Sequence, residues 1–532
     1  MYKLATIIIV SVSGLRSSYS QSFTSYLFIS EAMITALFIF GSLTYLIYRY
    51  YSYRNQYWAN RGIRGPEPEL FFGNLRSVWS YDNPRPLVLM EWTKKFGKVY
   101  GYLSGQRPFW VISDLTIINE IFVKRFDNFY AHARAELQES QDCADTHMAE
   151  ARGGHWKRLR TLSTDAFSNK AMRNIFPTIK KSAELMANLM EKKDGAEIDV
   201  LRHFREYTMD IISKVALGIS DNKMFENGYV GWCTDFFLKP LSHWMFALPS
   251  IFPSLVDFWR LCVILSSVFI DFPVITLARE IKKTVQERKR QREAGSPPTN
   301  DIIDMFLDAE ADVSEIDFGA DGQVRNKLSL DEIVVNVKLF LLAGYDTTSI
   351  TLARAVHFLA NDVKIQERLR EEVDDVIGTD DFDLEDIGNL PYAEAVVKET
   401  LRHHPLGSGF TTRECTASCE IEGYTFEKGD MIMPDVWSLQ MDKEVWGEDA
   451  EEFRPERWLN DTTRDRAAYL AFGEGPRICL GMKMAIIEAK VALVVLMRSF
   501  TIEKTKNTNP LKMVGSFLVA FDKVQVAMKR RG

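Results

Sequence analysis

The sequence has few of the residues that several functional classes need. Of its 532 residues only six are cysteine and eight are histidine. Cysteines so few and scattered indicate a reducing compartment and argue against a disulfide framework. The net charge is −7 at pH 7, with 65 basic and 72 acidic residues, so the excess of basic charge typical of nucleic-acid binding is missing. We therefore expect no nucleic-acid partner.

The glycine-rich loop near the C-terminus also lacks the spacing of common ligand motifs. After Gly473 and Gly475, a dinucleotide-binding loop would need a third glycine where Ile478 stands. The loop leads to Cys479, and no second cysteine or histidine lies within ten residues of it. A zinc site, which needs several such ligands, is therefore disfavoured.

Cys479 stands between this loop and an apolar helical run over residues 482–496. The free N–H groups and the dipole at a helix N-terminus favour a thiolate, and Arg477 places a cation beside it. A free cysteine is, however, often a small buried hydrophobic residue. The residues alone leave two interpretations open, inert packing or a single thiolate ligand to a metal such as haem iron, whose other ligands are not protein.

The loop fits the pattern Phe-x-x-Gly-x-Arg-x-Cys-x-Gly through Phe472, Gly475, Arg477, Cys479 and Gly481. This pattern resembles the haem-binding signature of the cytochrome P-450 monooxygenases. The resemblance implies haem b as cofactor, with the Cys479 thiolate as the axial ligand of the iron. It also implies a mainly α (α+β) fold, in which a large helical domain carries a small β-sheet region.

A second motif lies on the longest predicted helix. Ser329 and Glu332 form a capping box, and apolar residues continue to about residue 359. Within this helix, residues 343–348 read Ala-Gly-Tyr-Asp-Thr-Thr. The run is either an ordinary polar patch whose threonines bond back to the preceding turn, or a turn where Gly344 leaves room for a ligand or water.

The resemblance favours a functional role for this run, since it matches the oxygen-activation motif of the same family. Ala343 and Gly344 would then border the cofactor. Thr347 would form a hydrogen bond with the oxygen, and Asp346 would help to relay protons. Cleavage of the O–O bond needs protons delivered without admitting bulk water, which a short chain of side chains can provide.

Several cations are expected to hold the haem propionates. Trp156 and Arg160 stand at i,i+4 on one face of a predicted helix, which alone would indicate a solvated basic face. The resemblance implies that both bind a propionate, together with Arg413 and Arg477. Gln440 stands where many family members have a propionate-binding histidine, so that contact is expected to be missing.

Glu399 and Arg402 stand at i,i+3 on a helix that ends before Pro405. Such a pair is usually a surface ion pair of little energetic value. The resemblance implies instead that Glu399, Arg402 and Arg457 form a buried triad that supports the cysteine loop. These three residues are expected to be structural.

Two apolar segments come first in the chain. Residues 1–31 contain a short apolar run at 4–12 that resembles a signal-peptide core. Residues 32–48 carry no charge and are followed by four arginines before the first acid, which predicts a cytosolic side after the segment. Buried core helices are the alternative. We predict a transmembrane anchor at 32–48, a basic, proline-containing hinge at 49–74, and the catalytic domain at 75–532.

A long apolar and aromatic stretch, residues 236–277, is interrupted by four prolines and is therefore a poor second transmembrane helix. Plain core helices and helices that cover a hydrophobic cavity and dip into the membrane surface both remain open. Residues 406–410, after Pro405, are apolar or small and are candidates for a substrate pocket. They indicate lipophilic ligands.

Together these motifs predict a monooxygenase that inserts one oxygen atom from O2 into a lipophilic small molecule, such as a xenobiotic, steroid or fatty acid. The resemblance is to the microsomal drug- and steroid-metabolising branch. It implies NADPH electrons delivered through a flavoprotein reductase with FMN and FAD, cytochrome b5 as a further partner, and an endoplasmic reticulum membrane location with a cytosolic catalytic domain.

Two alternatives use the same cofactor. One is a haem-thiolate isomerase or dehydratase, and the other is a non-catalytic haem-binding protein. The isomerase needs no oxygen-activating threonine, so the intact Asp346-Thr347 pair argues against it.

Overall fold

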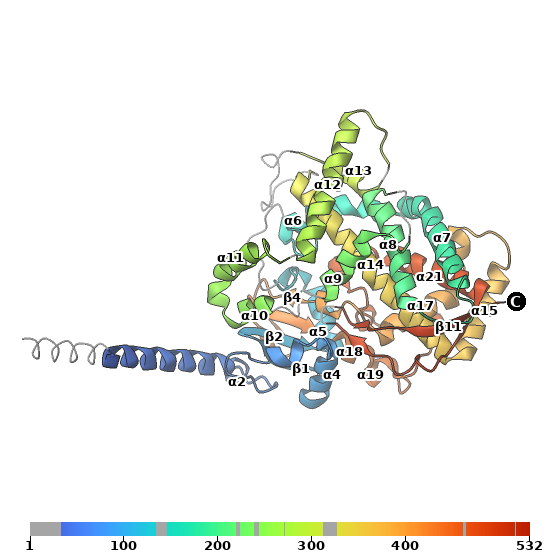
Figure 1. The fold of residues 1–532 in the computed structure, drawn as a ribbon. Helices are drawn as coiled ribbons and strands as arrows, with labels where there is room; N and C mark the ends of the chain where they lie inside the picture. The colour runs from blue at the N-terminus through green and yellow to red at the C-terminus, as the bar shows by residue number, and fades with distance from the viewer. Residues whose placement is uncertain are drawn as a thin grey trace, which may run out of the picture.

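The computed structural model describes residues 33–134, 146–219, 224–238, 244–270, 272–299, 301–311, 327–460, 464–515 and 518–531. The signal-like segment predicted at 1–31 lies outside the described residues. Helices form most of the domain, and the described strands form small sheets (Figure 1). The predicted mainly helical fold is therefore confirmed.

The longer helices of the domain follow one another along the chain with short connections. They are α4 (Arg85–Phe96), α6 (Gly153–Thr164), α7 (Asn169–Glu191), α8 (Val200–Leu217), α9 (Gly228–Leu238), α10 (Trp244–Ile251), α11 (Val256–Ser266), α12 (Pro273–Glu293), α14 (Leu330–Asn361), α15 (Val363–Val376), α17 (Pro391–His403) and α21 (Met482–Ser499). Short helices used below are α2 (Tyr57–Asn60) and α18 (Val436–Gln440).

The largest sheet has the strand order β1-β2-β7-β4. Its strands are β1 (Val99–Ser104), β2 (Arg107–Ile112), β7 (Met431–Pro434) and β4 (Arg413–Glu414). The first two form the antiparallel hairpin that their β-branched and aromatic residues favour, and β7 joins β2 in parallel. A second sheet pairs β3 (Glu197–Asp199), β11 (Gln525–Arg530) and β8 (Phe500–Glu503) near the C-terminus. The smaller pairs are β5 (Cys419–Ile421) with β6 (Tyr424–Phe426), and β9 (Met513–Val514) with β10 (Ala520–Phe521).

Helix α14 runs through the middle of the domain (Figure 1). It begins with the predicted capping box, in which the Ser329 hydroxyl accepts from the Glu332 amide and the Glu332 carboxylate accepts from the Ser329 amide. With 32 residues it is about 48 Å long. It contacts α8, α12, α17 and α21, so it is buried along most of its length.

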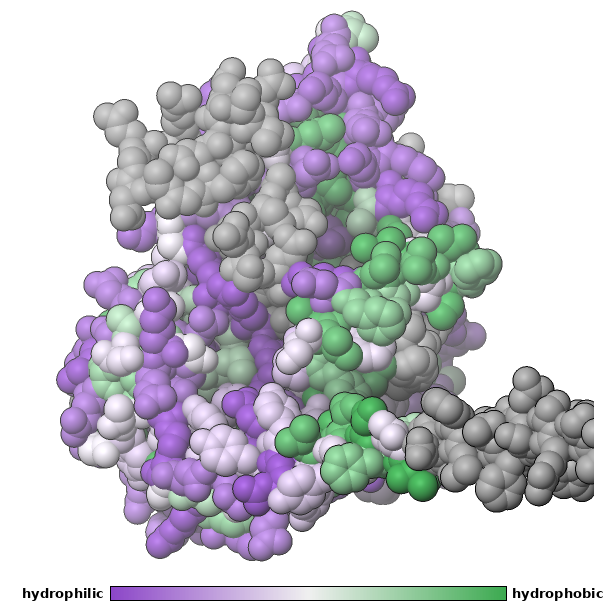
Figure 2. All heavy atoms as spheres, turned by 90° about the vertical axis from the view of Figure 1, so that its left-hand side faces the viewer, coloured by the Kyte–Doolittle hydropathy of each residue, from purple (hydrophilic) through white to green (hydrophobic). Residues whose placement is uncertain are grey.

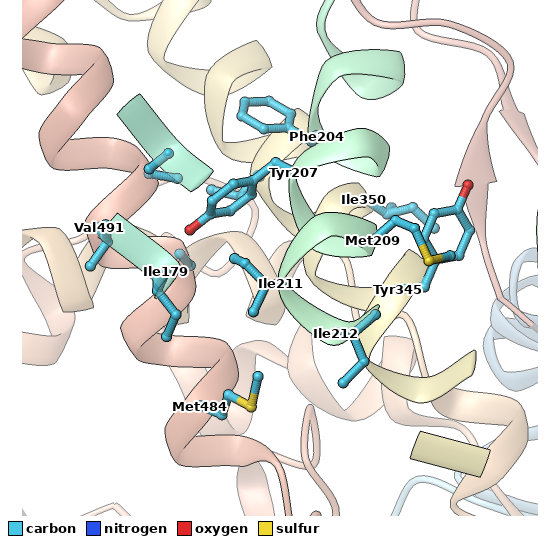
Figure 3. Close-up of a cluster of buried hydrophobic side chains, with 14 of the residues drawn as sticks. Ile179, Phe204, Tyr207, Met209, Ile211, Ile212, Tyr345, Ile350, Met484 and Val491 are labelled. Atoms are coloured by element: carbon cyan, nitrogen blue, oxygen red, sulfur yellow. The ribbon is translucent and has the colours of Figure 1, made fainter. Parts of the chain in front are cut away.

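The main hydrophobic core lies where α7, α8, α14 and α21 meet. Figure 3 shows its side chains pointing toward one another from these helices, among them Ile179, Tyr207, Ile211, Ile350 and Val491. Burial of this apolar surface is the principal force that holds the four helices together. The two helices that carry the sequence motifs, α14 and the one after Cys479, are thus fixed to each other by the core.

The buried triad expected at Glu399 is confirmed. Arg402 donates from Nη2 to Glu399 Oε1 over 2.9 Å, and Arg457 donates from Nε to the same oxygen over 2.9 Å. All three side chains are at most 1% exposed. Desolvation opposes ionisation, but the hydrogen bonds from His403 and Arg402 hold the pKa of Glu399 well below its ordinary value.

The N-terminal helix, Met33–Asn55, projects from the domain with its apolar side chains exposed (Figure 1). It is long and apolar enough to cross a membrane. Among the described helices, Leu330–Asn361 meets the same criterion but is 72% buried inside the domain, so it is a core helix. The chain after the projecting helix is packed: Trp58 is buried, and Arg61 makes a two-pronged ion pair with Asp430.

The apolar stretch 236–277 divides into helices with different surroundings. Phe237, at the end of α9, is buried in the main core. Helix α11 and the turn after it expose large hydrophobic side chains, with Val268 at 75% and Phe269 at 90%. Figure 2 shows hydrophobic side chains gathered on the side of the molecule from which the N-terminal helix leaves. Both interpretations of the sequence therefore hold for different parts of the stretch.

We expect Arg457→Met to lower the free energy of unfolding by about 3–5 kcal/mol, because it leaves the Glu399 carboxylate buried with one of its cations missing. Urea unfolding measures this change. The matched control is Lys512→Met, which removes an exposed partner of Asp82 and should cost less than about 1 kcal/mol. Equal unfolding midpoints for the two variants would show that the triad contributes no special stability.

Candidate active site

The loop before Cys479 is held in shape by its glycines and one backbone hydrogen bond. Gly475 has a φ of 72°, and a Cβ atom there would lie 2.0 Å from the carbonyl oxygen of Phe122. Only glycine combines this left-handed backbone with so close an approach. The Cys479 amide donates to the Phe472 carbonyl over 2.8 Å, which closes the loop. Gly481 then caps α21.

The Cys479 side chain is exposed, unlike the other described cysteines, which are buried or half-buried. Burial by the surrounding protein nevertheless raises the pKa of its thiol, while hydrogen bonds from the Gly481 and Met482 amides and the charge of Arg160 act in the opposite direction. A side chain that is accessible and yet desolvated faces an enclosed space rather than open solvent. These amides and Arg160 are the groups that favour the thiolate.

Arg477 is not the cation beside the thiol, which corrects the expectation from the sequence. Its guanidinium donates to the carbonyl oxygens of Tyr130 (3.0 Å), Met148 (3.2 Å) and Ala151 (2.6 Å). It also lies 4.2 Å from the ring centroid of Trp156. Because the side chain turns away from its own loop, Arg477 fixes the segment before α6, and the role at the thiol passes to Arg160.

Arg413 lies on β4, beside a histidine that the sequence motifs did not indicate. It is 1% exposed, and burial lowers its pKa to about 9. Its Nη1 donates to the Thr412 carbonyl over 3.0 Å and lies 3.3 Å from His132 Nδ1. Burial and the charges of Arg413 and Arg477 hold the pKa of His132 well below its ordinary value. No local pattern marks His132, since only the fold brings it to Arg413.

Two of these arginines lack an acidic partner. Among the described residues, no carboxylate pairs with Arg160 or Arg413, and the Nε of Arg413 is buried without an acceptor. A buried guanidinium without a counter-ion is costly unless a ligand supplies the negative charge. The site therefore suits a group that brings carboxylates of its own, as haem does with its two propionates.

Gln440, which stands in the place of a family histidine, supports the scaffold. Its amide donates to the carbonyl oxygens of Leu401 and Arg402, and its own oxygen accepts from the Leu470 amide. Every polar group of the side chain is thus used within the protein. The expected absence of a histidine contact at this position agrees with that geometry.

Residues 343 and 347 form the accessible part of α14. Ala343 is exposed and Thr347 is half-buried, although the helix around them is almost wholly buried. Thr347 donates from Oγ1 to the Ala343 carbonyl over 2.7 Å, and Thr351 donates to the Thr347 carbonyl over 2.8 Å. The back-bonding that we considered as the ordinary alternative does occur. It leaves the Thr347 oxygen directed along an accessible helix face, where it can accept a hydrogen bond.

Gly344 serves the packing of two helices and not space for a ligand. A Cβ atom at this position would lie 2.8 Å from Ile212 Cδ1 and 2.9 Å from Ile212 Cγ1, on α8. Figure 3 shows Ile212 directed from α8 toward α14, near Tyr345. Helix α14 is continuous through this point. The glycine is therefore required because α8 approaches closely, which corrects the expectation of a relaxed turn.

Asp346 points toward α8 and is fully buried. Arg205 Nε donates to Asp346 Oδ1 over 2.8 Å, and the Ser349 hydroxyl lies 3.2 Å from the same oxygen. Asp346 stands about 100° around the helix from Thr347. The two residues predicted to act together thus share a turn but face different neighbours, which sequence adjacency could not show.

Aromatic side chains connect the cysteine loop to α14. A Cβ atom on Gly481 would contact the Phe167 ring at 3.7 Å, and that ring lies 5.5 Å from the ring of Phe340 on α14. A second connection runs through Met148, whose carbonyl accepts from Arg477 and whose amide donates to Asn336. The structure therefore brings the two motifs, far apart in the chain, to one region.

Comparison with known proteins agrees with this geometry. The model of the cytochrome P450 family matches residues 63–528. The chain is 36% identical to the Caenorhabditis elegans protein named cytochrome P450 CYP13A2, with 94% of this chain and 98% of the relative covered. It is 36% identical to CYP13A3, with 91% and 97% covered, and 34% identical to cyp-13B1, with 94% and 99% covered, both from the same organism. The chain therefore belongs to the cytochrome P450 family.

Membership of this family makes the protein an oxidoreductase, a haem-thiolate monooxygenase. Its cofactor is haem with a cysteine thiolate as ligand. In the described part of the chain, no group of three or more His, Cys, Asp or Glu side chains could hold a metal ion by itself.

We expect Gly344→Ala to lower the free energy of unfolding by about 1–2 kcal/mol, because the methyl group overlaps Ile212. Replacing Ile212 by valine in the same chain removes the Cδ1 atom and should restore part of the loss, which a double-mutant cycle in urea measures. The matched control is Gly231→Ala on α9, where nothing lies within 4 Å, and it should stabilise by up to ~1 kcal/mol. Additive effects of the first two substitutions would contradict this account of Gly344.

Proposed function

We propose that Cys479 is the axial ligand and that Arg160, Arg413, Trp156 and His132 hold the haem propionates. The observation that carries this proposal is the accessible but desolvated Cys479 thiol, which faces an enclosed space near two arginines without carboxylate partners. When bound, haem with an axial thiolate supplies oxygen activation, since the thiolate favours O–O cleavage.

The protein groups around the propionates would act in different ways. Arg413 would supply its buried charge, and Arg160 would serve both the thiolate and a propionate. The His132 Nδ1 donates to the Thr412 carbonyl over 2.8 Å, so its Nε2 is free to take up a proton when a carboxylate approaches. Arg477, through its contact with Trp156, would position the indole N–H and not itself bind the anion.

On the oxygen side, Thr347 would hold a hydrogen bond to the oxygen and pass on a proton from its Oγ1 atom. Its hydroxyl proton now points to the Ala343 carbonyl, so delivery requires a rotation about χ1. Asp346 would supply the proton only after it leaves Arg205, because a carboxylate that accepts from a guanidinium does not donate. Gly481, Phe472 and Gly475 would shape the cysteine loop, and Ala343 would border the ring.

The proposed substrate is a lipophilic small molecule, such as a xenobiotic, steroid or fatty acid. Leu406 is buried, and Gly409 lines a small cavity with Leu89, Met433 and Trp437, so the segment after Pro405 offers mostly apolar surface. NADPH electrons would arrive through a flavoprotein reductase with FMN and FAD, with cytochrome b5 as a further partner. These partners follow from the resemblance to the microsomal branch.

We further propose that the protein is attached to the endoplasmic reticulum membrane through two surfaces. One is the N-terminal helix, and the other is the exposed face of α11 with the turn after it. Tyr51, at the base of the N-terminal helix, donates to the Ile251 carbonyl over 3.1 Å and packs against Phe252. Because this contact joins the two regions, one membrane surface can receive both (Figure 2).

Cys479→Ala should abolish the thiolate-type Soret band in the reduced carbon-monoxide difference spectrum, because no other accessible cysteine lies in the loop. The matched control is Cys419→Ala, a half-buried cysteine on β5, which should keep the band at wild-type intensity. A thiolate band that survives Cys479→Ala would overturn the axial assignment.

A chain that begins at Gln56 should stay partly bound to vesicles of phosphatidylcholine after a salt wash, because α11 remains. Adding Val268→Ser and Phe269→Ser should release most of it, as sedimentation with the vesicles measures. The matched control carries Val363→Ser and Val376→Ser, exposed residues of α15 on the opposite side of the domain (Figure 1), and should bind like the unsubstituted short chain. Equal binding by all three short chains would rule out α11 as a membrane surface.

A further inference from the structure

A buried carboxyl group connects the two helices that carry the site. Glu488 lies on α21, the helix that follows the Cys479 loop, and is 3% exposed. Its side chain forms a hydrogen bond with the hydroxyl of Thr348, the neighbour of Thr347 on α14. From α8, the Tyr207 hydroxyl donates to the Glu488 carbonyl over 2.9 Å. Figure 3 shows the Tyr207 hydroxyl directed toward the helix that carries Met484 and Val491.

The surroundings of this carboxyl group are apolar and contain no cation for it. Met484, Ile487 and Val491, on the same helix, belong to the main core. Among the described residues, no lysine, arginine or histidine forms an ion pair with Glu488. The groups that face it are Thr348 from α14 and Tyr207 from α8, and burial raises the Tyr207 pKa well above its ordinary value, so that hydroxyl stays neutral.

Desolvation raises the pKa of Glu488 to about 8, against which the Thr348 hydrogen bond acts only weakly. The side chain is therefore mostly protonated at neutral pH. A neutral acid can remain in an apolar layer as long as it is hydrogen-bonded, whereas an unpaired carboxylate there is strongly disfavoured. Ionisation would thus favour entry of water between α14 and α21.

An acid is a costly choice for a position that leucine could fill, unless its hydrogen bond is needed. That bond joins the residue next to Thr347 to the helix that begins after Cys479. A misplacement of about 1 Å between reacting groups can cost ~10²-fold in rate. A fixed distance between these helices is what the proposed chemistry would require of the scaffold.

We propose that Glu488 is a positioning residue, which in its neutral form ties the Thr347 turn of α14 to the helix that presents Cys479. The inference rests on the proposed roles of Thr347 and Cys479. It predicts that the tie holds at neutral pH and weakens as the pH rises through about 8. Glutamine, which is neutral and keeps both hydrogen-bonding functions, should replace the acid at every pH.

The test compares four haem-loaded proteins, the wild type, Glu488→Gln, Glu488→Leu and Thr348→Val. Hydrogen exchange of residues 343–352, corrected for the intrinsic effect of pH, measures the tie. Hydrogen peroxide released per NADPH, with a flavoprotein reductase and 7-ethoxycoumarin as probe, measures the position of Thr347. We expect wild-type protection to fall roughly fivefold between pH 7 and 9, which corresponds to about one lost hydrogen bond. Glu488→Gln should stay level, and the other two should be low throughout, with more peroxide.

The matched control is Glu206→Gln, which neutralises another buried acid of raised pKa that accepts from the Phe225 amide and not from α14. It should follow the wild type. If Glu488→Gln loses protection with pH as the wild type does, another group titrates and the proposal fails. If protection changes while the peroxide ratio does not, Glu488 is merely structural. A wild type without the thiolate-type spectrum would instead contradict the proposed function itself.

Discussion

The site depends on a chain of hydrogen bonds that starts at the buried Glu399 carboxylate. Arg402 binds this carboxylate through its side chain, and its carbonyl accepts from Gln440. Gln440 in turn accepts from the Leu470 amide, and the Leu470 carbonyl accepts from the Gly473 amide. The loop that ends at Cys479 is thus suspended from a fully buried ion pair. Each link would leave an unsatisfied polar group in the interior if it were broken, so the loop is held rigidly before any ligand binds.

Two kinds of buried charge coexist in the molecule and serve different ends. The charges at Glu399 and at Asp346 are matched by arginines within the protein, so they stabilise one arrangement of the helices. The charges of Arg160 and Arg413 have no such match among the described residues. The scaffold is therefore complete by itself, whereas the site is electrically incomplete without an anionic ligand.

Much of this could be predicted from the sequence, because the relevant information is local. The capping box at Ser329, the β1-β2 hairpin, the helix after Cys479 and the helix that ends at His403 all follow from residues close together in the chain. The triad at Glu399 was accessible only through the resemblance, since its partner Arg457 is distant and an isolated Glu–Arg pair indicates nothing.

What the sequence did not reveal depends on contacts between distant segments. Gly344 was interpreted through its own helix, but Ile212 on α8 determines its role. Arg477 stands beside Cys479 in the chain and yet turns away from it, while Arg160 approaches from α6. His132 carries no motif at all. In each case the direction of a side chain is set by tertiary packing, which neighbouring letters do not encode.

The packed segment after the N-terminal helix has a mechanical consequence. Arg61 is held by both oxygens of Asp430 and lies over the Trp110 ring, while Trp58 lies so close to Gly101 that a Cβ atom there would be 2.1 Å from the indole. Such a joint transmits torque and does not swivel. If the helix stands in a bilayer, the domain has one azimuth and one tilt, and a soluble partner that diffuses along the surface always meets the same side of it.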